Sequence, residues 1–359
     1  MTTSLSIIIP VYNGERYLDQ LFGTLSTQGI FEPETRIPVE LILIDDGSTD
    51  GSAGIIRSYM ERYPGVIRCH HQENAGQAAA RNKGIDMARM KYVYMMDQDD
   101  ILVPDMLIPM TLRLEQDGSD MIRFGFREVP SSEMSEVAAN LLALGEIHTR
   151  IVRGRDYIRM TDYLSGETTI WTTVVRRDFL NRNAIRFDPS IRMIDDYLFN
   201  MHMFLVDPRV SVCDNCGIIY INYPESDCHN LEKGHVWSRR PSFALLSDRI
   251  WDILEDGGKY VARDKDIDEW LEKVKSSYLV QYWFLAIRWM PDNRDVFENE
   301  LTHEAGRGML RPRSGFPFRL KPFTPAWAGF RLVWAGMKHP SLMRMLLSGR
   351  SAVKKLTGR

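Results

Sequence analysis

Short hydrophobic runs alternate with amphipathic stretches through the first 110 residues. Four runs predict strands, and each of the first three is followed by a polar loop and a pattern of apolar residues three or four positions apart, typical of a helix. The four predicted strands are Ser4–Pro10, Val39–Ile44, Val66–His70 and Tyr92–Met96. Strands that alternate with helices at this pitch predict an α/β fold with a parallel sheet and helices on both faces.

Polar side chains follow three of these predicted strands directly. Tyr12 and Asn13 come after the first strand, Asp45 and Asp46 after the second, and the acidic segment 97–100 after the fourth. In sheets of this kind, ligands bind beyond the carboxyl ends of the strands. The sequence therefore predicts one polar, acidic pocket built from three loops.

The pattern is less regular after about residue 120. The block Ile170–Phe187 predicts a strand and then a helix, and the apolar residues of Ile194–Phe199 suit the first turns of a buried helix. Residues 242–305 are predicted to be mostly helical, and no internal repeat is found.

The formal net charge of -3 hides an uneven distribution of charge along the chain. From Ala305 onward there are 12 Lys and Arg and no Asp or Glu, which leaves 33 bases against 48 acids in the preceding residues. An acidic body argues against nucleic acid as a partner, because a phosphate backbone needs clustered bases along the binding face.

Targeting and redox signals are weak. The chain starts with a short strand-like run without a basic region before it, and no window approaches the roughly 18 to 20 apolar residues of a spanning helix. The expectation is a cytoplasmic protein without a transmembrane anchor. Four cysteines are too few for a disulfide framework, and the spacing of Cys213 and Cys216 does not predict a zinc site.

The acidic segment 97–100 is the strongest chemical signal. Neighbouring carboxylates repel one another unless a cation neutralises them, and Mg²⁺ and Mn²⁺ prefer oxygen ligands. If the segment is extended, Asp97 and Asp99 lie on one side of it. This spacing suits a metal that also binds a diphosphate, although an acidic helix cap is an alternative for the segment taken alone.

Four ordered motifs make the pattern specific: SIIIPVYNGE, LILIDDGSTDGS, NAGQAAARNKGI and MMDQDDILVPD. Together they resemble glycosyltransferase family 2 of the bacterial cell-surface polysaccharide type, strongly over residues 4 to about 110 and more weakly to about 225. The resemblance implies an A-type glycosyltransferase fold with a helical C-terminal extension. We expect a catalytic domain over 1–225, with donor half 1–110 and acceptor half 111–225, then a helical extension over 226–305 and a basic tail over 306–359.

The resemblance also implies roles in binding the sugar donor. Pro10 and Tyr12 would line the nucleobase pocket, where Tyr12 offers a face for stacking. Asp46, or less favourably Asp45, would accept a hydrogen bond from the base. The remaining expected donor ligands are Arg81 on the diphosphate, Asp97 on the ribose or sugar, and Gln98. Structural readings stay open for two of these residues, with Tyr12 as a core aromatic and Arg81 in a surface ion pair.

The expected reaction is a single displacement that inverts the anomeric centre. Mn²⁺ or Mg²⁺, bound by Asp99 and Asp97, would act as a Lewis acid on the departing nucleoside diphosphate. Asp196 is the expected catalytic base, because Asp195-Asp196 resembles the family's Glu-Asp pair ahead of an aromatic residue. The alternative is that Asp195 caps a helix and that Asp196 pairs with Arg192 or Arg186. The regions around Trp171 and His229 are expected to shape the acceptor site.

The expected partners are a nucleotide sugar, with UDP as its nucleotide, and a glycan or lipid-linked acceptor. Residues 311–359 mix bases with aromatic side chains, which fits peripheral contact with anionic lipid on the inner face of the membrane. The tail could instead pack on the acidic body of the same chain.

Three other classes of protein are alternatives to a glycosyltransferase. A nucleotidyltransferase usually needs a Gly-rich basic loop after the first strand, which PVYNGERYL lacks. A signalling domain would need its acidic pair after the first strand. A non-catalytic nucleotide-sugar-binding protein is disfavoured by the presence of both metal and base carboxylates.

Overall fold

The computed structural model describes residues 2–139, 145–161, 169–192, 194–222, 240–256, 258 and 260–275. The chain divides into two compact units, Met1–His229 and Asn230–Arg359. The basic tail over 306–359 and His229 lie outside the described residues, as does the latter part of the expected helical extension.

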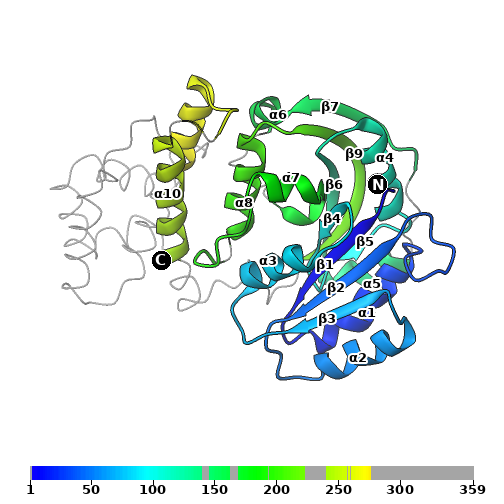
Figure 1. The fold of residues 1–359 in the computed structure, drawn as a ribbon. Coiled ribbons are helices and arrows are strands. Elements are labelled where there is room, and N and C mark those ends of the chain that lie inside the picture. The colour runs from blue at the N-terminus through cyan, green and yellow to red at the C-terminus, as the bar shows by residue number, and fades with distance from the viewer. Residues whose placement is uncertain are drawn as a thin grey trace, which may run out of the picture. The chain divides into compact units, whose positions relative to one another are not determined.

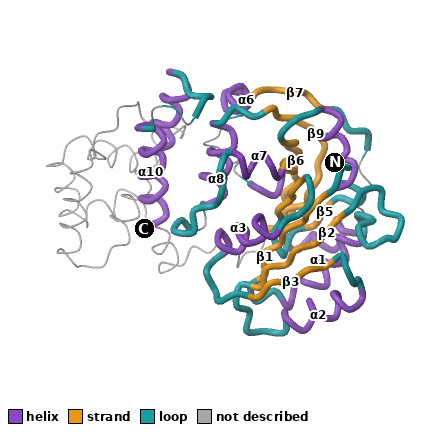
Figure 2. Tube along the Cα trace, in the orientation of Figure 1, coloured by secondary structure: helices purple, strands orange, loops and turns teal. Residues whose placement is uncertain are grey.

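The first unit is built around one mixed sheet (Figures 1 and 2). The strand order is β3-β2-β1-β4-β8-β6-β9-β5, with β7 paired to β9. The strands are β1 Leu5–Val11, β2 Val39–Asp45, β3 Ile67–His71, β4 Tyr92–Met95, β5 Ile101–Leu102, β6 Met121–Pro130, β7 Thr149–Arg153, β8 Thr173–Arg176 and β9 Arg209–Asn222. The helices of this unit are α1 Glu15–Ser26, α2 Ser52–Arg62, α3 Gln77–Met87, α4 Leu107–Asp117, α5 Met134–Ala139, α6 Gly154–Met160, α7 Arg177–Arg182 and α8 Asp195–Leu205, with short 3₁₀ turns η1 Ser131–Glu133 and η2 Ile170–Thr172.

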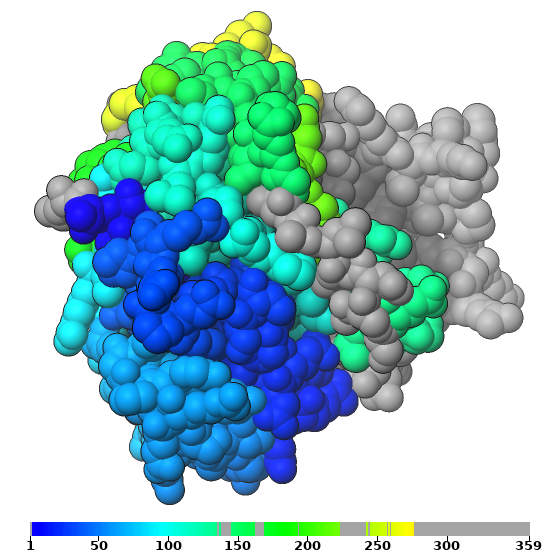
Figure 3. All heavy atoms as spheres, turned by 90° about the vertical axis from the view of Figure 1, so that its right-hand side faces the viewer, coloured from blue at the N-terminus to red at the C-terminus, as the bar shows by residue number. Residues whose placement is uncertain are grey.

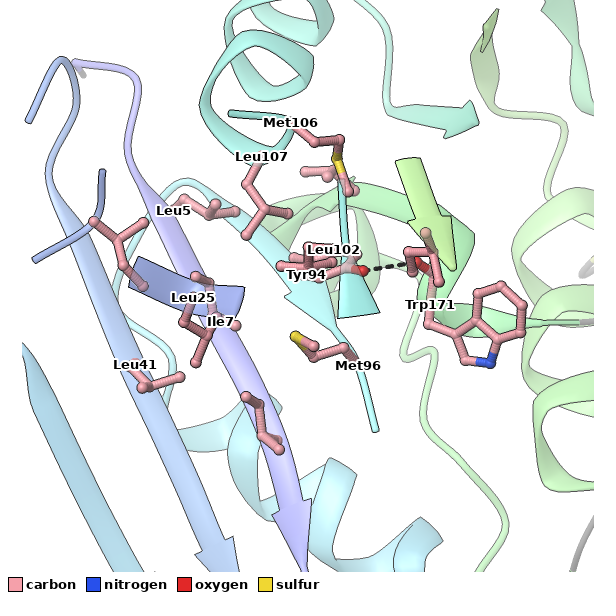
Figure 4. Packing of buried hydrophobic residues seen from close by; sticks show 14 of the residues in the cluster. Leu5, Ile7, Leu25, Leu41, Tyr94, Met96, Leu102, Met106, Leu107 and Trp171 are labelled. Atoms are coloured by element: carbon pink, nitrogen blue, oxygen red, sulfur yellow. Dashed lines mark hydrogen bonds between the residues drawn. The ribbon is translucent and has the colours of Figure 1, made fainter. Parts of the chain in front are cut away.

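The side chains of β1 alternate between two cores. Leu5, Ile7 and Ile9 belong to one buried cluster with Leu25 of α1, and Figure 4 shows part of this packing. Ile8 points to the other face, where α3 lies against the strand. Both faces of a parallel strand are therefore covered, which explains why β1 is hydrophobic at nearly every position.

The sequence prediction of an α/β fold with a central sheet flanked by helices is confirmed. The strands β3, β2, β1 and β4 are parallel, as expected from their alternation with helices. In the second half, β8 pairs antiparallel with both β4 and β6. The space-filling view shows the blue and light-blue atoms of the first strands and helices forming a continuous surface beside later, green segments (Figure 3).

The described part of the second unit contains α10 Arg240–Glu255 and a helix over 265–275. Leu246 and Ile250 of the first helix and Leu271 and Val274 of the second are buried. Among the described residues, no helix is long and apolar enough to cross a membrane.

Gly84 is a position at which the packing of α3 on β1 can be tested. A methyl group at this residue would lie 2.2 Å from Cγ2 of Ile8, a branched side chain fixed in the core. We expect Gly84→Ala to lower the free energy of unfolding by about 1–3 kcal/mol through overpacking, which outweighs any gain in helix propensity. Urea denaturation measures this change.

The matched control is Gly23→Ala in α1, where a methyl group would meet no atom within 4 Å. This variant should keep or raise stability, by about 0.5–1 kcal/mol, because alanine favours the helix. Equal destabilisation of both variants would contradict the close approach of α3 to β1.

Candidate active site

The loops after β1 and β2 are joined by reciprocal hydrogen bonds. The main-chain N–H of Asn13 donates to the hydroxyl of Ser48 at 3.0 Å, and the N–H of Thr49 donates back to Oδ1 of Asn13 at 2.9 Å. The N–H of Gly14 donates to the hydroxyl of Ser52 at 2.8 Å. Asn13 adopts a positive φ of 46°, which asparagine tolerates better than most residues. The two loops therefore form one rigid wall at the carboxyl edge of the sheet.

Tyr12 is presented to solvent at this edge by Gln98. The side-chain amide of Gln98 accepts from the N–H of Tyr12 at 3.1 Å and donates to its carbonyl oxygen at 3.2 Å. Tyr12 is 50% exposed, so it is not a core aromatic residue. Its exposed ring can stack on a base. Pro10, in contrast, is buried within β1 opposite Ile44.

Asp46 anchors the loop between β3 and α3. Its Oδ1 accepts hydrogen bonds from Nε2 of Gln72 and from the N–H of Ala75, and its Oδ2 accepts from the N–H of Gly76. A carboxylate has about four lone-pair sites, so one remains for a ligand. The base-reading role of Asp46 stays a prediction.

Asp45, the residue before Asp46, is also held by hydrogen bonds from neighbouring loop and strand residues. It accepts hydrogen bonds from the N–H of Ser48 at 2.9 Å and contacts Nδ1 of His71 at 2.9 Å. Burial acts to raise the pKa of Asp45, but the hydrogen bonds from Ser48 and His71 outweigh it and the pKa is lowered. Asp45 therefore stays ionised and braces the β2 loop.

Arg81 joins the donor loops to the first turn of α8. Its guanidinium donates from Nη2 to Asp97 at 2.7 Å, and from Nη1 to Asp195 at 3.2 Å and Asp196 at 2.5 Å. Arg81 is only 1% exposed, so it is not a surface ion pair. Its buried Nε has no hydrogen-bond partner among the described residues. The predicted contact between Arg81 and the diphosphate is untested, and the observed partners are carboxylates.

Asp196 is positioned through both of its oxygens. Oδ1 accepts from Arg81, and Oδ2 accepts from the N–H of Ile170 at 3.4 Å. Asp196 therefore pairs with Arg81, and Arg186, one of the two alternative partners, bonds to Asp86 instead. Burial raises the pKa of Asp196 to about 7, although Arg81 opposes the shift. Burial also raises the pKa of Asp195.

The segment 97–100 is not extended as its spacing suggested. Residues 98 and 99 form a turn, which Oδ2 of Asp100 closes by accepting from the N–H of Asp97 at 2.9 Å. The turn separates the roles of the carboxylates. Asp97 binds Arg81 and Gln77, whereas the carboxylate of Asp99 accepts a hydrogen bond from its own main-chain N–H. Burial and then the charge of Asp97 raise the pKa of Asp99 to about 6.

These carboxylates have the chemistry of a partial metal site. Within the described ranges, no three His, Cys, Asp or Glu side chains are grouped as metal ligands. Mg²⁺ is commonly bound by one or two carboxylates and completes its shell with water and substrate phosphates. Asp99, whose pKa stays raised although the charge of Arg16 acts to lower it, fits this requirement, and Asp97 is the second candidate.

Several structural residues of the site carry only weak sequence signals. Gln72, Gln77 and Ser52 bond to loop groups or acidic side chains, yet they are ordinary polar residues within helices and turns. The acceptor side shows the same limitation. Trp171 is buried against Tyr220, with ring centroids 5.6 Å apart, and its neighbour Ile170 contributes only a main-chain N–H to Asp196.

The two cysteines of the Cys-x-x-Cys pair lie in β9 and contact oxygen acceptors. Sγ of Cys213 donates to Oδ1 of Asn215 at 3.1 Å, and Sγ of Cys216 donates to the carbonyl oxygen of Ile218 at 3.2 Å. Burial raises the pKa of both thiols. They act as packed side chains of the strand.

Comparison with known proteins places this fold and site in a family. Residues 6–181 match the family described as Glycosyl transferase family 2. The chain is 32% identical over 232 residues to the Uncharacterized glycosyltransferase EpsJ of Bacillus subtilis, with 63% of each protein covered. It is 31% identical over 309 residues to the Minor teichoic acid biosynthesis protein GgaA of Bacillus subtilis, with 84% of this chain and 63% of that protein covered.

A solved structure shares the fold. The crystal structure of S. aureus TarS 1-349 in complex with UDP matches with a TM-score of 0.61 at 17% identity, covering 97% of this chain and 91% of that one. The match of residues 6–181 to glycosyl transferase family 2 confirms the resemblance seen in the four motifs. The chain spans about 63% of the length of EpsJ and of GgaA.

The raised pKa values of Asp99 and Asp196 predict how stability depends on pH. The folded protein binds more protons than the unfolded chain between the ordinary carboxyl pKa of 3.8 and about 7. The free energy of unfolding should therefore fall as pH rises through this range. Thermal unfolding midpoints measured from about pH 5.5 to pH 8 should decrease, and Asp196→Asn should flatten the profile because an amide does not ionise.

Asp178→Asn is the matched control for this slope. Asp178 is an exposed residue of α7 that pairs with Arg182 at 3.1 Å, away from the site. Its profile should run parallel to that of the unaltered protein. A profile of Asp196→Asn that is equally steep would show that Asp196 does not titrate abnormally.

Proposed function

We propose that this protein transfers a sugar from a nucleoside diphosphate sugar, with UDP as the nucleotide, to a hydroxyl group of a glycan or lipid-linked acceptor. The process would be the synthesis of a cell-surface polysaccharide. The observation that carries the proposal is a chain of bonds through the segment that contains Asp99. Gln98 bonds to the main chain of Tyr12, and Asp97 bonds to Arg81, which also bonds to Asp196. An exposed ring, a carboxylate of raised pKa that can bind a cation and a buried carboxylate of raised pKa are the parts that such a reaction needs.

The relatives support the class of donor and product. TarS has been crystallised with UDP, and a relative of that name is a poly(ribitol-phosphate) beta-N-acetylglucosaminyltransferase of Staphylococcus aureus. GgaA is named for teichoic acid biosynthesis. These names favour a UDP-sugar donor and a polyhydroxylated surface polymer as acceptor.

The donor would lie along the loops after β1, β2 and β4. Tyr12 would stack on the base, and the open lone pair of Asp46 would accept from a base N–H. Asp97 would contact the ribose or sugar beside Gln98. Asp99, with Asp97, would hold Mn²⁺ or Mg²⁺, whose chemistry is to stabilise the charge of the departing diphosphate.

Asp196 would remove the proton from the acceptor hydroxyl. Among the described residues, its Oδ2 accepts only from the N–H of Ile170, at 3.4 Å, so a lone pair on that atom can accept the proton. A pKa of about 7 lies close to the operating pH, which is the favourable range for a general base. The acceptor oxygen would then attack the anomeric carbon opposite the leaving group, and the sugar's configuration would invert.

Metal-dependent binding of UDP provides a first test. We expect Asp99→Asn to weaken UDP binding in the presence of Mn²⁺ by about tenfold or more, because the amide is a poorer ligand for a hard cation. Isothermal titration calorimetry with UDP, with and without Mn²⁺, measures this effect. Asp178→Asn should bind UDP like the unaltered protein, and binding indifferent to both Mn²⁺ and Asp99→Asn would refute the proposed metal site.

Turnover tests the base. The expected result is that Asp196→Asn lowers kcat by about 10² to 10⁴ while KM for the donor changes little, because the base acts in the chemical step. The assay measures UDP release from UDP-GlcNAc, UDP-glucose and UDP-galactose with Mn²⁺, with Asp178→Asn as the control. Full turnover by Asp196→Asn would exclude Asp196 as the base.

A further inference from the structure

Arg123 is a buried base in the acceptor half that donates hydrogen bonds to two hydroxyl groups and one main-chain carbonyl. It lies in β6 and is 4% exposed. Its Nε donates to the hydroxyl of Tyr157 at 3.2 Å, and its Nη1 donates to the hydroxyl of Thr173 at 2.7 Å and to the carbonyl oxygen of Thr169 at 2.9 Å. Burying a guanidinium is costly, so its geometry needs several well-placed acceptors.

The bond from Arg123 to Thr169 reaches the proposed base through a single peptide group. The carbonyl of Thr169 and the N–H of Ile170 belong to the same planar peptide. The carbonyl accepts from Arg123 at 2.9 Å, and the N–H donates to Oδ2 of Asp196 at 3.4 Å. A cation that bonds to the carbonyl orients this peptide and polarises its N–H, which strengthens the donor.

Other contacts fix Arg123 itself. The guanidinium lies 5.8 Å from the ring centroid of Tyr157 and 5.9 Å from that of Phe204, which is part of α8. Arg123 therefore packs against the last turns of the helix that begins with Asp195 and Asp196. One side chain thus braces α8 at its far end and, through the peptide, contributes to the position of the carboxylate at its start.

We propose that Arg123 is a positioning residue, which holds the Thr169–Ile170 peptide so that its N–H orients the carboxylate of Asp196 toward the acceptor. This inference rests on the proposed role of Asp196 as the base. Arg81 restrains Oδ1 of the same carboxylate from the donor side. Arg81, by a direct bond to Asp196, and Arg123, through the Thr169–Ile170 peptide, would then together define the direction of Oδ2.

A competing role for Arg123 is direct binding of the acceptor. A cavity of about 210 Å³ lies beside it, lined also by Phe126, Tyr157, Thr169 and Asp214. The two roles differ when water replaces the acceptor. A positioning residue still matters for hydrolysis of the donor, whereas a residue that only binds the acceptor does not.

The experiment measures kcat and KM for hydrolysis of UDP-GlcNAc with Mn²⁺, using the full chain without an added acceptor. We expect Arg123→Gln to lower kcat by about 10- to 100-fold with little change in KM, because misorientation of a catalytic group acts on the chemical step. Arg123→Lys should recover part of the loss, since an ammonium group can still donate to the Thr169 carbonyl. The Arg123→Lys variant also keeps the test valid if Arg123→Gln folds poorly.

The matched control is Arg177→Gln. Arg177 also donates to main-chain carbonyls, those of Met90 at 2.8 Å and Ala88 at 3.2 Å, but these precede β4 at the opposite edge of the sheet. This variant should keep kcat. Unchanged hydrolysis by Arg123→Gln, or a loss of kcat in Arg177→Gln as large as that in Arg123→Gln, would overturn the positioning role.

A double-mutant cycle separates this inference from the proposed function. If Arg123 acts through Asp196, Arg123→Gln should cause no further loss in a chain that already carries Asp196→Asn. A full additional loss would show that Arg123 acts elsewhere and would overturn the inference. Full turnover by Asp196→Asn alone would instead overturn the assignment of the base, and this is a different result from an additive cycle.

Discussion

Three carboxylates share one buried guanidinium in the first unit, where the loop after β4 meets the start of α8. Asp97, Asp195 and Asp196 all bond to Arg81, whose planar fork can serve several acceptors but carries a single positive charge. The cluster therefore has more negative than positive charge in a buried place. Raising the pKa of Asp195 and Asp196 reduces this imbalance, because a protonated carboxyl group needs no counter-charge.

The same charge balance explains why a cation suits the donor side. Asp99 and Asp100 add two further carboxylates beside Asp97, and burial raises the pKa of both. A donor diphosphate would bring more negative charge into this region. A divalent cation beside Asp99 would offset the repulsion among the carboxylates and the repulsion between them and the diphosphate. Asp97, two residues away, is already restrained by Arg81 and Gln77 at the carboxyl end of β4.

The sequence predicts well which polar residues follow the strands β1, β2 and β4, because these positions depend on local rules. Strand periodicity places Tyr12, Asp45, Asp46 and Asp97 at strand ends, and parallel strands end at one edge. The turn at Gln98 and Asp99 was not predicted. Alternate spacing of two carboxylates places them on one side of a segment only if that segment is extended. The strand within Ile170–Phe187 was predicted and is β8, but its antiparallel direction was not, because a hydrophobic run indicates a strand and not its direction.

The acceptor side could not be predicted from spacing, because its contacts join distant segments and use main-chain groups. Arg81 and Asp196 are 115 positions apart, and Arg123 reaches Asp196 through a peptide that leaves no trace in residue type. The donor loops are bound to each other within the first 100 residues. Substitutions in β6, β9 or the residues before α8 would therefore change the surroundings of Asp196 and leave the bonds among the loops after β1, β2 and β4 in place.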